Sequence, residues 1–235
     1  MFHVSQSLAR DCEAAVRLCV VLLTYNRLEY ATRTLDSFYE YVTPKVHLHI
    51  ADDGSPNGYV DELAKVAKEV GAPSITVSNS ERGGYGRSFN LATQTTHELA
   101  DACFVLEDDW CALRPLDLRE LAADLDALPG IDCIRLGYLG WTQPMGGRLV
   151  AGPNYKYLEL DPNSPEPHVF AGHPRLERVS YQREVGPWPE NVNPNETEFL
   201  VAHYRRARQG VAWPLGIDAR EGYGIFCHIG TERAR

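Results

Sequence analysis

The sequence lacks a long apolar run and any pattern of closely paired cysteines. No stretch reaches the roughly 18 apolar residues that a membrane-spanning helix needs, and residues 1–17 lack the basic start and apolar middle of a signal peptide. The six cysteines are scattered, and none forms a CxxC pair. We therefore expect reduced, mostly buried thiols and a cytoplasmic protein with no membrane anchor.

Basic charge is also scarce. Against 23 Lys and Arg stand 32 Asp and Glu, a formal net charge of −9, which argues against a dedicated nucleic-acid binder. A local basic patch remains open, because Arg33 and the three arginines at 205, 206 and 208 can supply one. The 235 residues are 44% hydrophobic, which suits a globular protein with a substantial core.

A repeated unit fills the first part of the chain. Short apolar runs predict strands at 18–23, 46–51, 74–78 and 103–106. Each is followed by a polar or glycine-rich turn and then by helical spacing at 28–41, 60–70, 88–100 and 117–128. Four such units predict a mostly parallel sheet with right-handed crossovers, whose turns gather on one edge. Ligands bind at that edge in open α/β sheets.

The rest of the chain is less regular. A strand is predicted at 131–136, and residues 137–175 read as loops and short antiparallel strands with aromatic residues between Gly and Pro. A helix is predicted from Asn195, as its N-cap, to about Gln209. Late strands are expected at 211–217 and 223–228, and a short leading helix at 7–16.

Three consecutive carboxylates, Glu107-Asp108-Asp109, end the strand that begins at Cys103. Neighbouring carboxylates repel one another unless a cation lies among them, and Mg2+ or Mn2+ commonly joins one or two carboxylates to substrate phosphates. The alternative is an acidic turn that only caps the helix at 117–128.

Three motifs occur in order at the ends of successive predicted strands: Val20-Val-Leu-Leu-Thr-Tyr-Asn-Arg27, Ile50-Ala-Asp-Asp-Gly-Ser55 and Leu106-Glu-Asp-Asp109. Together they resemble the GT-A-type glycosyltransferases, particularly the inverting family-two group. The resemblance covers most of residues 18–110 and returns in pieces up to His228. It implies an α/β fold of GT-A (Rossmann-like) type, with a mixed, mainly parallel central sheet flanked by helices. It also implies a single domain over 1–235, in which about 18–130 bind the nucleotide sugar and about 131–235 bind the acceptor and carry the catalytic base.

The resemblance assigns donor contacts to the first two turns. It implies that Thr24, Tyr25 and Arg27 line the nucleobase pocket, where Tyr25 can stack on a base and Arg27 can contact base or phosphate. Asp53 matches the acid that accepts a hydrogen bond from the base, and Asp52 is a ribose or structural contact. The alternative for these residues is ordinary turn chemistry.

The third turn is rich in glycine. In Gly83-Gly84-Tyr85-Gly86 the backbone can approach a ligand closely, and the following helix offers N–H groups to an anion. We expect Gly84 and Arg87 to contact the donor, with Arg82 adding positive charge. The segment is neither a GxGxxG fingerprint nor a Walker loop, and a plain glycine turn is the alternative.

The acidic triplet matches the DxD position of the family. The resemblance implies that Asp109 binds a divalent ion, Mn2+ or Mg2+, and that Glu107 or Asp108 holds ribose hydroxyls or metal-bound water. A late histidine is the expected second ligand. His228 is the candidate for it, with His173 next.

Inverting transfer needs a base that takes a proton from the acceptor. The family's ED-x-D pair aligns with Asn195-Glu196-Thr197-Glu198, which gives Glu196 the base position and makes Glu198 the second acid. The alternative is a pair of acids that favour the first turn of a helix. Trp188 precedes this segment, where the family places acceptor contacts, and could stack on a sugar or a base.

The expected function is metal-dependent, inverting transfer of a sugar from a nucleotide-diphosphate sugar, with UDP favoured, to a hydroxyl acceptor. The acceptor is expected to be soluble, and a glycan, a protein and a modified nucleic acid all stay open. Two other functions are the alternatives. A sugar-phosphate nucleotidyltransferase would usually carry a GxGxR-like N-terminal loop, which is absent, and a non-catalytic nucleotide-sugar-binding module would keep the fold without turnover.

Overall fold

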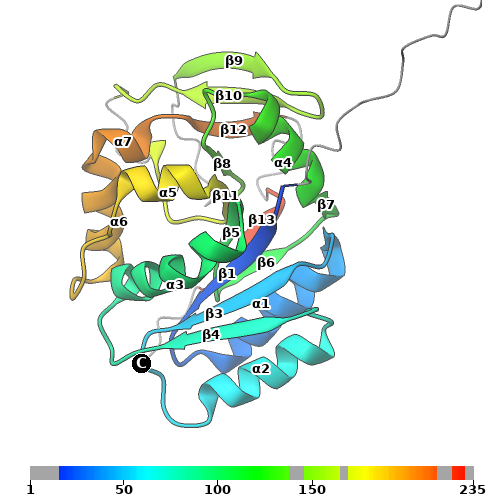
Figure 1. Cartoon of the computed structure of the whole chain (residues 1–235), viewed down its shortest axis with the longest axis vertical. Helices are drawn as coiled ribbons and strands as arrows, with labels where there is room; N and C mark the ends of the chain where they lie inside the picture. Colours follow the sequence, from blue (N-terminus) through cyan, green and yellow to red (C-terminus); the bar gives the residue numbers. More distant parts are fainter. Residues whose placement is uncertain (1–15, 138–145, 165–168, 216–223, 231–235) are drawn as a thin grey trace, which may run out of the picture.

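One mixed sheet runs through both halves of the chain in the computed structural model, which describes residues 16–137, 146–164, 169–215 and 224–230. The helix expected at 7–16 lies almost wholly outside these residues. Within them, nine strands follow the order β4-β3-β1-β5-β11-β8-β12-β10-β9 (Figure 1). They are β1 (Leu18–Thr24), β3 (His47–Asp52), β4 (Ile75–Asn79), β5 (Ala102–Glu107), β8 (Cys133–Arg135), β9 (Gly147–Ala151), β10 (Lys156–Leu160), β11 (Arg175–Arg178) and β12 (Val211–Leu215).

The predicted parallel part is confirmed. β1 pairs in parallel with β3 on one side and with β5 on the other, and β4 continues the parallel set beyond β3. β11 then enters antiparallel between β5 and β8, and β10 pairs antiparallel with both β12 and β9. The expected α/β class with a mixed, mainly parallel sheet therefore holds, and the antiparallel strands come from the second half of the chain.

Helices cover both faces of the sheet because successive strand side chains point to opposite sides. Val20 and Leu22 of β1 pack in one core with α1 (Leu28–Tyr41), α2 (Tyr59–Glu69) and α4 (Leu118–Ala127). Val21 and Leu23 pack in the other with α3 (Tyr85–Leu99), α5 (Val179–Val185), α6 (Pro194–His203) and α7 (Arg205–Arg208). Figure 1 shows α1 and α2 on one side and α3, α5 and α6 on the other.

The helix predicted at 195–209 is wrong in two respects. It is two helices, α6 and α7, because Tyr204 between them takes an extended conformation. The N-cap of α6 is Asn193 rather than Asn195: the Asn193 side chain accepts a hydrogen bond from the Glu196 N–H, and Pro194 occupies the first turn, where it needs no N–H partner. The helix α5 was not predicted.

Two small two-stranded sheets complete the strands of the described residues. β6 (Trp110–Ala112) pairs antiparallel with β13 (Phe226–His228), and β2 (Val42–Thr43) pairs with β7 (Leu116–Asp117). The late strand predicted at 223–228 is therefore shorter than expected, and that at 211–217 is described only as far as Leu215. Among the described helices, none combines the length and the apolar character that crossing a membrane requires.

Register explains why the predicted turns meet. Thr24 at the end of β1 lies beside Asp52 of β3, and Leu23 lies beside Glu107 of β5. The next residues continue the match, because the Asp53 N–H donates to the Thr24 carbonyl at 3.1 Å and the Asp108 N–H donates to the Leu23 carbonyl at 3.1 Å. The three motifs therefore share one edge of the sheet.

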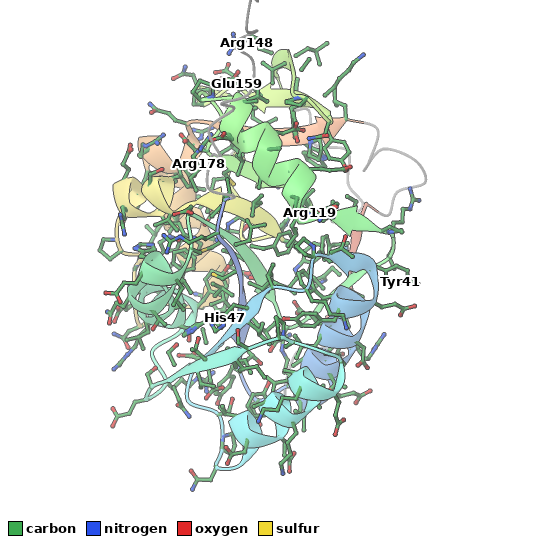
Figure 2. All side chains as sticks on the ribbon, turned by 45° about the vertical axis from the view of Figure 1, so that its right-hand side comes forward. Tyr41, His47, Arg119, Arg148, Glu159 and Arg178 are labelled. Carbon is green, nitrogen blue, oxygen red and sulfur yellow. The ribbon has the colours of Figure 1, made fainter. Side chains whose placement is uncertain are left out.

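A buried histidine on β3 makes the stability of this region depend on pH. His49 has no exposed surface; its ring nitrogens lie 2.8 Å from Thr76 Oγ1 and 3.0 Å from Ser78 Oγ. Figure 2 labels its neighbour His47 on the same strand. Burial lowers the pKa of His49 to about 4. The unfolded chain, with a histidine pKa near 6.5, therefore takes up a proton that the folded protein does not.

The stability that neutral His49 contributes is complete above about pH 6.5, falls as the pH drops from 6.5 to 4, and is constant below that. When the pH falls from 7 to 4.5, we expect the free energy of unfolding of the wild type to drop by roughly 2 kcal/mol more than that of His49→Gln. Urea unfolding of both proteins at the two pH values measures this. Equal losses would show that another group carries the dependence.

Candidate active site

A pocket of about 750 Å³ opens at the edge where β1, β3 and β5 end. Its volume is that of a typical small-molecule site. The expected site residues that line it are Thr24, Tyr25, Arg27, Asp53, Gly84, Glu107, Asp108, Asp109, Glu198 and His228, and Arg82 and His173 line it too. Asp52, Arg87 and Glu196 are not among the lining residues.

Asp53 ties the second turn to the glycine-rich turn. Its Oδ1 accepts hydrogen bonds from the Gly83 N–H at 2.8 Å and the Gly84 N–H at 2.9 Å. Asp52 instead accepts from the N–H and hydroxyl of Ser55 within its own turn, the first at 2.9 Å. Of the two roles considered for Asp52, the geometry supports the structural one. The contact between Asp53 and a base stays a prediction.

Asp108 holds the first turn in place. It is buried and accepts hydrogen bonds from Thr24 Oγ1 at 2.9 Å, from the Tyr25 N–H at 3.2 Å and from Arg27 Nη2. Burial raises the pKa of Asp108 to about 6, although the charge of Arg27 opposes that shift. Above this turn the guanidinium of Arg82 lies 4.3 Å from the centre of the Tyr25 ring, a cation–π contact.

Asp109 meets the C-terminal segment of the described chain. β13 places His228 opposite Trp110, and the Ile229 N–H donates to the Asp109 carbonyl at 2.8 Å. His228 Nε2 then lies 3.3 Å from Asp109 Oδ2. A Cβ at Gly230 would lie 2.2 Å from that oxygen, so the close approach requires glycine. Burial raises the pKa of Asp109, but hydrogen bonds and charge from His228 and Arg27 outweigh it and lower the pKa below its ordinary value.

Asp109 and His228 fit a divalent cation that takes further ligands from elsewhere. Among the described residues, no group of three or more His, Cys, Asp or Glu is arranged to hold a metal. Neighbouring ligands of an octahedral ion, each about 2.1 Å from it, lie about 3 Å apart. The 3.3 Å between the Asp109 oxygen and the His228 nitrogen matches this spacing. Phosphate and water oxygens would complete such a site.

His173, the second histidine considered, lines the same pocket but is engaged. Its Nδ1 lies 3.3 Å from Arg135 Nη2 and 3.2 Å from the Gly137 carbonyl. Its ring packs against Trp110 with the ring centres 5.1 Å apart. Of the two histidines, His228 is therefore better placed to bind a cation together with Asp109.

Two glutamates from distant segments meet at Gly172. The Gly172 N–H donates to Glu198 Oε1 at 2.8 Å, and a Cβ at Gly172 would lie 3.3 Å from Glu107 Oε1 and 3.1 Å from the Tyr85 hydroxyl. Glu107 also accepts from Trp110 Nε1 at 3.0 Å. Burial raises the pKa of Glu107 to about 8, and the charges of Asp109 and Glu198 add to the shift. Sequence reasoning missed Gly172 and Tyr85 as site residues.

Glu196 and Glu198 are separated by the geometry of α6. Glu196 is exposed, and its Oε2 lies 3.2 Å from Asn193 Nδ2 at the helix cap. Residues two apart in an α-helix point about 200° apart, so only one of the pair can face the pocket. The structure brings Glu198 there, whereas the alignment had given Glu196 the base position.

Trp188 does not lie in the pocket, although its place in the sequence predicts an acceptor contact. It is 3% exposed, and its ring stacks on Phe89 with the ring centres 4.3 Å apart. The Asn90 side chain fixes its backbone, since Nδ2 donates to the Trp188 carbonyl at 3.0 Å and Oδ1 accepts from the Trp188 N–H at 2.8 Å. A ring enclosed in this way has no face left for a sugar or a base.

Two of the arginines considered for a local basic patch, Arg206 and Arg208, have partners among the described residues. Arg206 pairs with Asp132 at 2.9 Å and with Glu184 at 2.6 Å, and Arg208 donates to the Ser164 carbonyl at 2.5 Å. The side chain of residue 205 lies outside the described part, and Arg33 is exposed on α1. The basic patch therefore stays a prediction, with Arg206 and Arg208 held by partners within the chain.

The mixed sheet, with turns that converge on an acidic strand end, defines a GT-A-type fold. A family model described as "Glycosyl transferase family 2" matches residues 19–183. The chain belongs to this family.

Solved structures agree on the fold. TarS of S. aureus in complex with UDP-GlcNAc matches with a TM-score of 0.64 and 16% identity over 84% of this chain and 55% of the TarS chain. The mannosyltransferase PcManGT of Pyrobaculum calidifontis, with GDP-Man and Mn2+, matches with a TM-score of 0.57 and 15% identity over 94% of this chain and 63% of that one. GalNAc-T7 with UDP, GalNAc and Mn2+ matches with a TM-score of 0.57 and 16% identity over 86% of this chain and 43% of the GalNAc-T7 chain. The chain thus spans less than two thirds of each of these proteins, and no curated protein matches it.

Proposed function

We propose that this protein is an inverting, metal-dependent glycosyltransferase that moves a sugar from a UDP-linked donor to a hydroxyl acceptor. One observation carries the proposal: a single pocket joins the Asp53–glycine turn, the acidic strand end, His228 and Glu198. These residues come from five separate segments of the chain. The UDP-sugar complex of TarS and the Mn2+ complexes of PcManGT and GalNAc-T7 support the same donor and ion classes.

The donor side of the pocket is assigned to the first three turns. Tyr25 and Arg82 would contact the nucleobase, Asp53 would order the glycine turn next to the donor, and Arg27 would face its phosphates. Asp109 and His228 would hold Mn2+ or Mg2+, which neutralises the charge that develops on the diphosphate leaving group. Glu107 would accept a sugar or ribose hydroxyl.

The acceptor side is assigned to α6 and the segment at Gly172. Glu198, held through the Gly172 N–H, would take the proton from the acceptor hydroxyl as its oxygen attacks the anomeric carbon. Attack from the face opposite the diphosphate inverts the configuration. We propose Glu198 rather than Glu196 for this step because only Glu198 lines the pocket. The acceptor itself is proposed as a soluble glycan, protein or other hydroxyl compound.

The test is calorimetric titration with UDP, UDP-sugars and GDP-sugars, each with and without Mn2+. We expect UDP-sugars to bind. Mn2+ should tighten their binding about ten-fold or more, because the ion adds one ionic contact to the diphosphate. Asp109→Asn should lose the Mn2+ effect, and Asp126→Asn, an exposed acid on α4, should keep it.

Absence of binding by any nucleotide, with or without the metal, would overturn the proposal. Release of pyrophosphate from a nucleoside triphosphate and a sugar phosphate would instead identify a nucleotidyltransferase. Donor binding without transfer to any hydroxyl acceptor or water would identify a binding module.

A further inference from the structure

One carboxylate oxygen of the candidate metal site has two partners. Asp109 Oδ2 lies 2.8 Å from Arg27 Nη1 and 3.3 Å from His228 Nε2. The other arm of the same guanidinium, Nη2, pairs with Asp108. Arg27 thus spans two consecutive carboxylates and occupies the oxygen that a divalent cation would share with His228.

The carboxylates need a cation at this place. The Asp108 and Asp109 side chains are 1% and 9% exposed, and two buried carboxylates side by side repel each other and have lost most of their hydration. Among the described residues that line the pocket, Arg27 supplies the guanidinium paired with both. The other lining arginine, Arg82, lies over Tyr25.

The Arg27 side chain is free to move away from the two carboxylates. It precedes α1 and makes no side-chain capping hydrogen bond, and its side chain is 25% exposed, by far the most exposed of the three charged groups. Its Cζ already lies 5.7 Å from the centre of the Tyr30 ring, a second favourable contact that does not involve the carboxylates. A long arginine side chain can therefore turn at low cost while Asp108 and Asp109 stay fixed.

We propose that Arg27 is a tethered counter-ion of the metal site. It neutralises Asp108 and Asp109 while no divalent cation is bound, gives up Asp109 Oδ2 to the arriving cation, and then turns to an anion in the pocket. The identity of that anion as the donor diphosphate rests on the proposed function; the exchange at Asp109 does not. Because coupling between ligands is reciprocal, cation and nucleotide strengthen each other through this one side chain.

The test measures Mn2+ binding without nucleotide, by calorimetry or by the spin-resonance signal of free Mn2+. Arg27→Gln removes the competitor, so we expect Mn2+ to bind roughly ten-fold or more tightly than to the wild type, which is the worth of one charge-assisted hydrogen bond. In Arg27→Gln, UDP should also strengthen Mn2+ binding less than it does in the wild type. Arg33→Gln changes an exposed arginine on α1, the helix that follows Arg27. It is the matched control and should leave Mn2+ affinity within about two-fold, since an exposed charge is screened.

A second variant separates displacement from simple loss of charge. Arg27→Lys keeps the charge but cannot span both carboxylates as a planar fork, so its Mn2+ affinity should fall between those of the wild type and Arg27→Gln. If Arg27→Gln is poorly folded without metal, Mn2+ should raise its melting temperature by more than it raises that of the wild type.

Mn2+ affinity in Arg27→Gln equal to or weaker than in the wild type would overturn the proposal, as would a failure of both proteins to bind Mn2+. If Arg27→Gln binds Mn2+ more tightly but no protein binds any nucleotide, the counter-ion role stands and the proposed function fails. If UDP-sugars bind but Arg27→Gln leaves Mn2+ affinity unchanged, the proposed function stands and the counter-ion role fails.

Discussion

Glu198→Gln is expected to slow sugar transfer by about 10²- to 10⁴-fold, the range that a general base contributes. The glutamine oxygen can still accept the Gly172 N–H that Glu198 Oε1 accepts at 2.8 Å, so the side chain should keep its place and lose only its ability to take a proton. Donor affinity should change by no more than a few-fold. Release of UDP from a UDP-sugar, with an accepted hydroxyl compound or with water, measures the rate.

Glu196→Gln is the matched control because it makes the same chemical change two residues away. Glu196 is exposed and contacts the Asn193 cap, so we expect transfer within about three-fold of the wild type and a loss below about 1 kcal/mol in stability. If Glu196→Gln abolished transfer and Glu198→Gln did not, the base would be the residue that the alignment had favoured, and α6 would have to turn in the working enzyme.

These outcomes bear on what a sequence can predict. The four strand–turn–helix units were predictable because each strand is a continuous apolar run and each helix has a regular apolar spacing. The meeting of Thr24, Asp53 and Asp108 followed from topology alone, since parallel strands bring their carboxyl ends to one edge. His228 could be paired with Asp109 only by resemblance, because 119 positions separate them in the chain.

The expectations that the geometry does not support concern residues whose position depends on side-chain direction or long-range packing. Two glutamates two residues apart look equivalent in a sequence, and only the start of α6 at Pro194, capped by Asn193, shows which of them faces inward. Trp188 is expected at the acceptor because it precedes α6, where the family places acceptor contacts, yet Phe89 of α3 encloses it. Gly172 carried no signal at all, since its role depends on the approach of side chains from β5, α3 and α6.

The same region holds a buried ion pair that local sequence patterns did not reveal. Arg175 and Glu177, two residues apart on β11, have side chains 0% and 2% exposed and are joined from Nε to Oε1 at 2.5 Å. Arg175 Nη1 also donates to the Gly172 carbonyl at 2.9 Å, and Gln182 donates to the second Glu177 oxygen at 2.8 Å. The guanidinium lies among aromatic rings, 5.2 Å from the centre of Phe170. Through the Gly172 carbonyl it therefore supports the segment whose N–H holds Glu198.

Arg175→Met is expected to lower the free energy of unfolding by about 3–5 kcal/mol, because it leaves the Glu177 carboxylate buried without a counter-charge. That is a large part of the total stability of an ordinary domain, about 5–15 kcal/mol. Urea unfolding at neutral pH measures it. Glu177→Gln should cost a similar amount, whereas the double variant Arg175→Met/Glu177→Leu should recover most of the loss, since an apolar pair of similar volume often replaces a buried ion pair without cost.

The double variant also separates stability from positioning. It restores packing but cannot donate to the Gly172 carbonyl, so the segment that holds Glu198 loses one of its hydrogen bonds. We expect a protein of nearly wild-type stability whose turnover stays reduced by roughly ten-fold, with donor affinity unchanged, since small misplacements of a catalytic group are costly. Full recovery of turnover along with stability would show that the ion pair serves the core alone. Turnover that stays low in a stable protein would show that Arg175 positions the segment that holds Glu198, a role that apolar side chains of the same volume cannot fill.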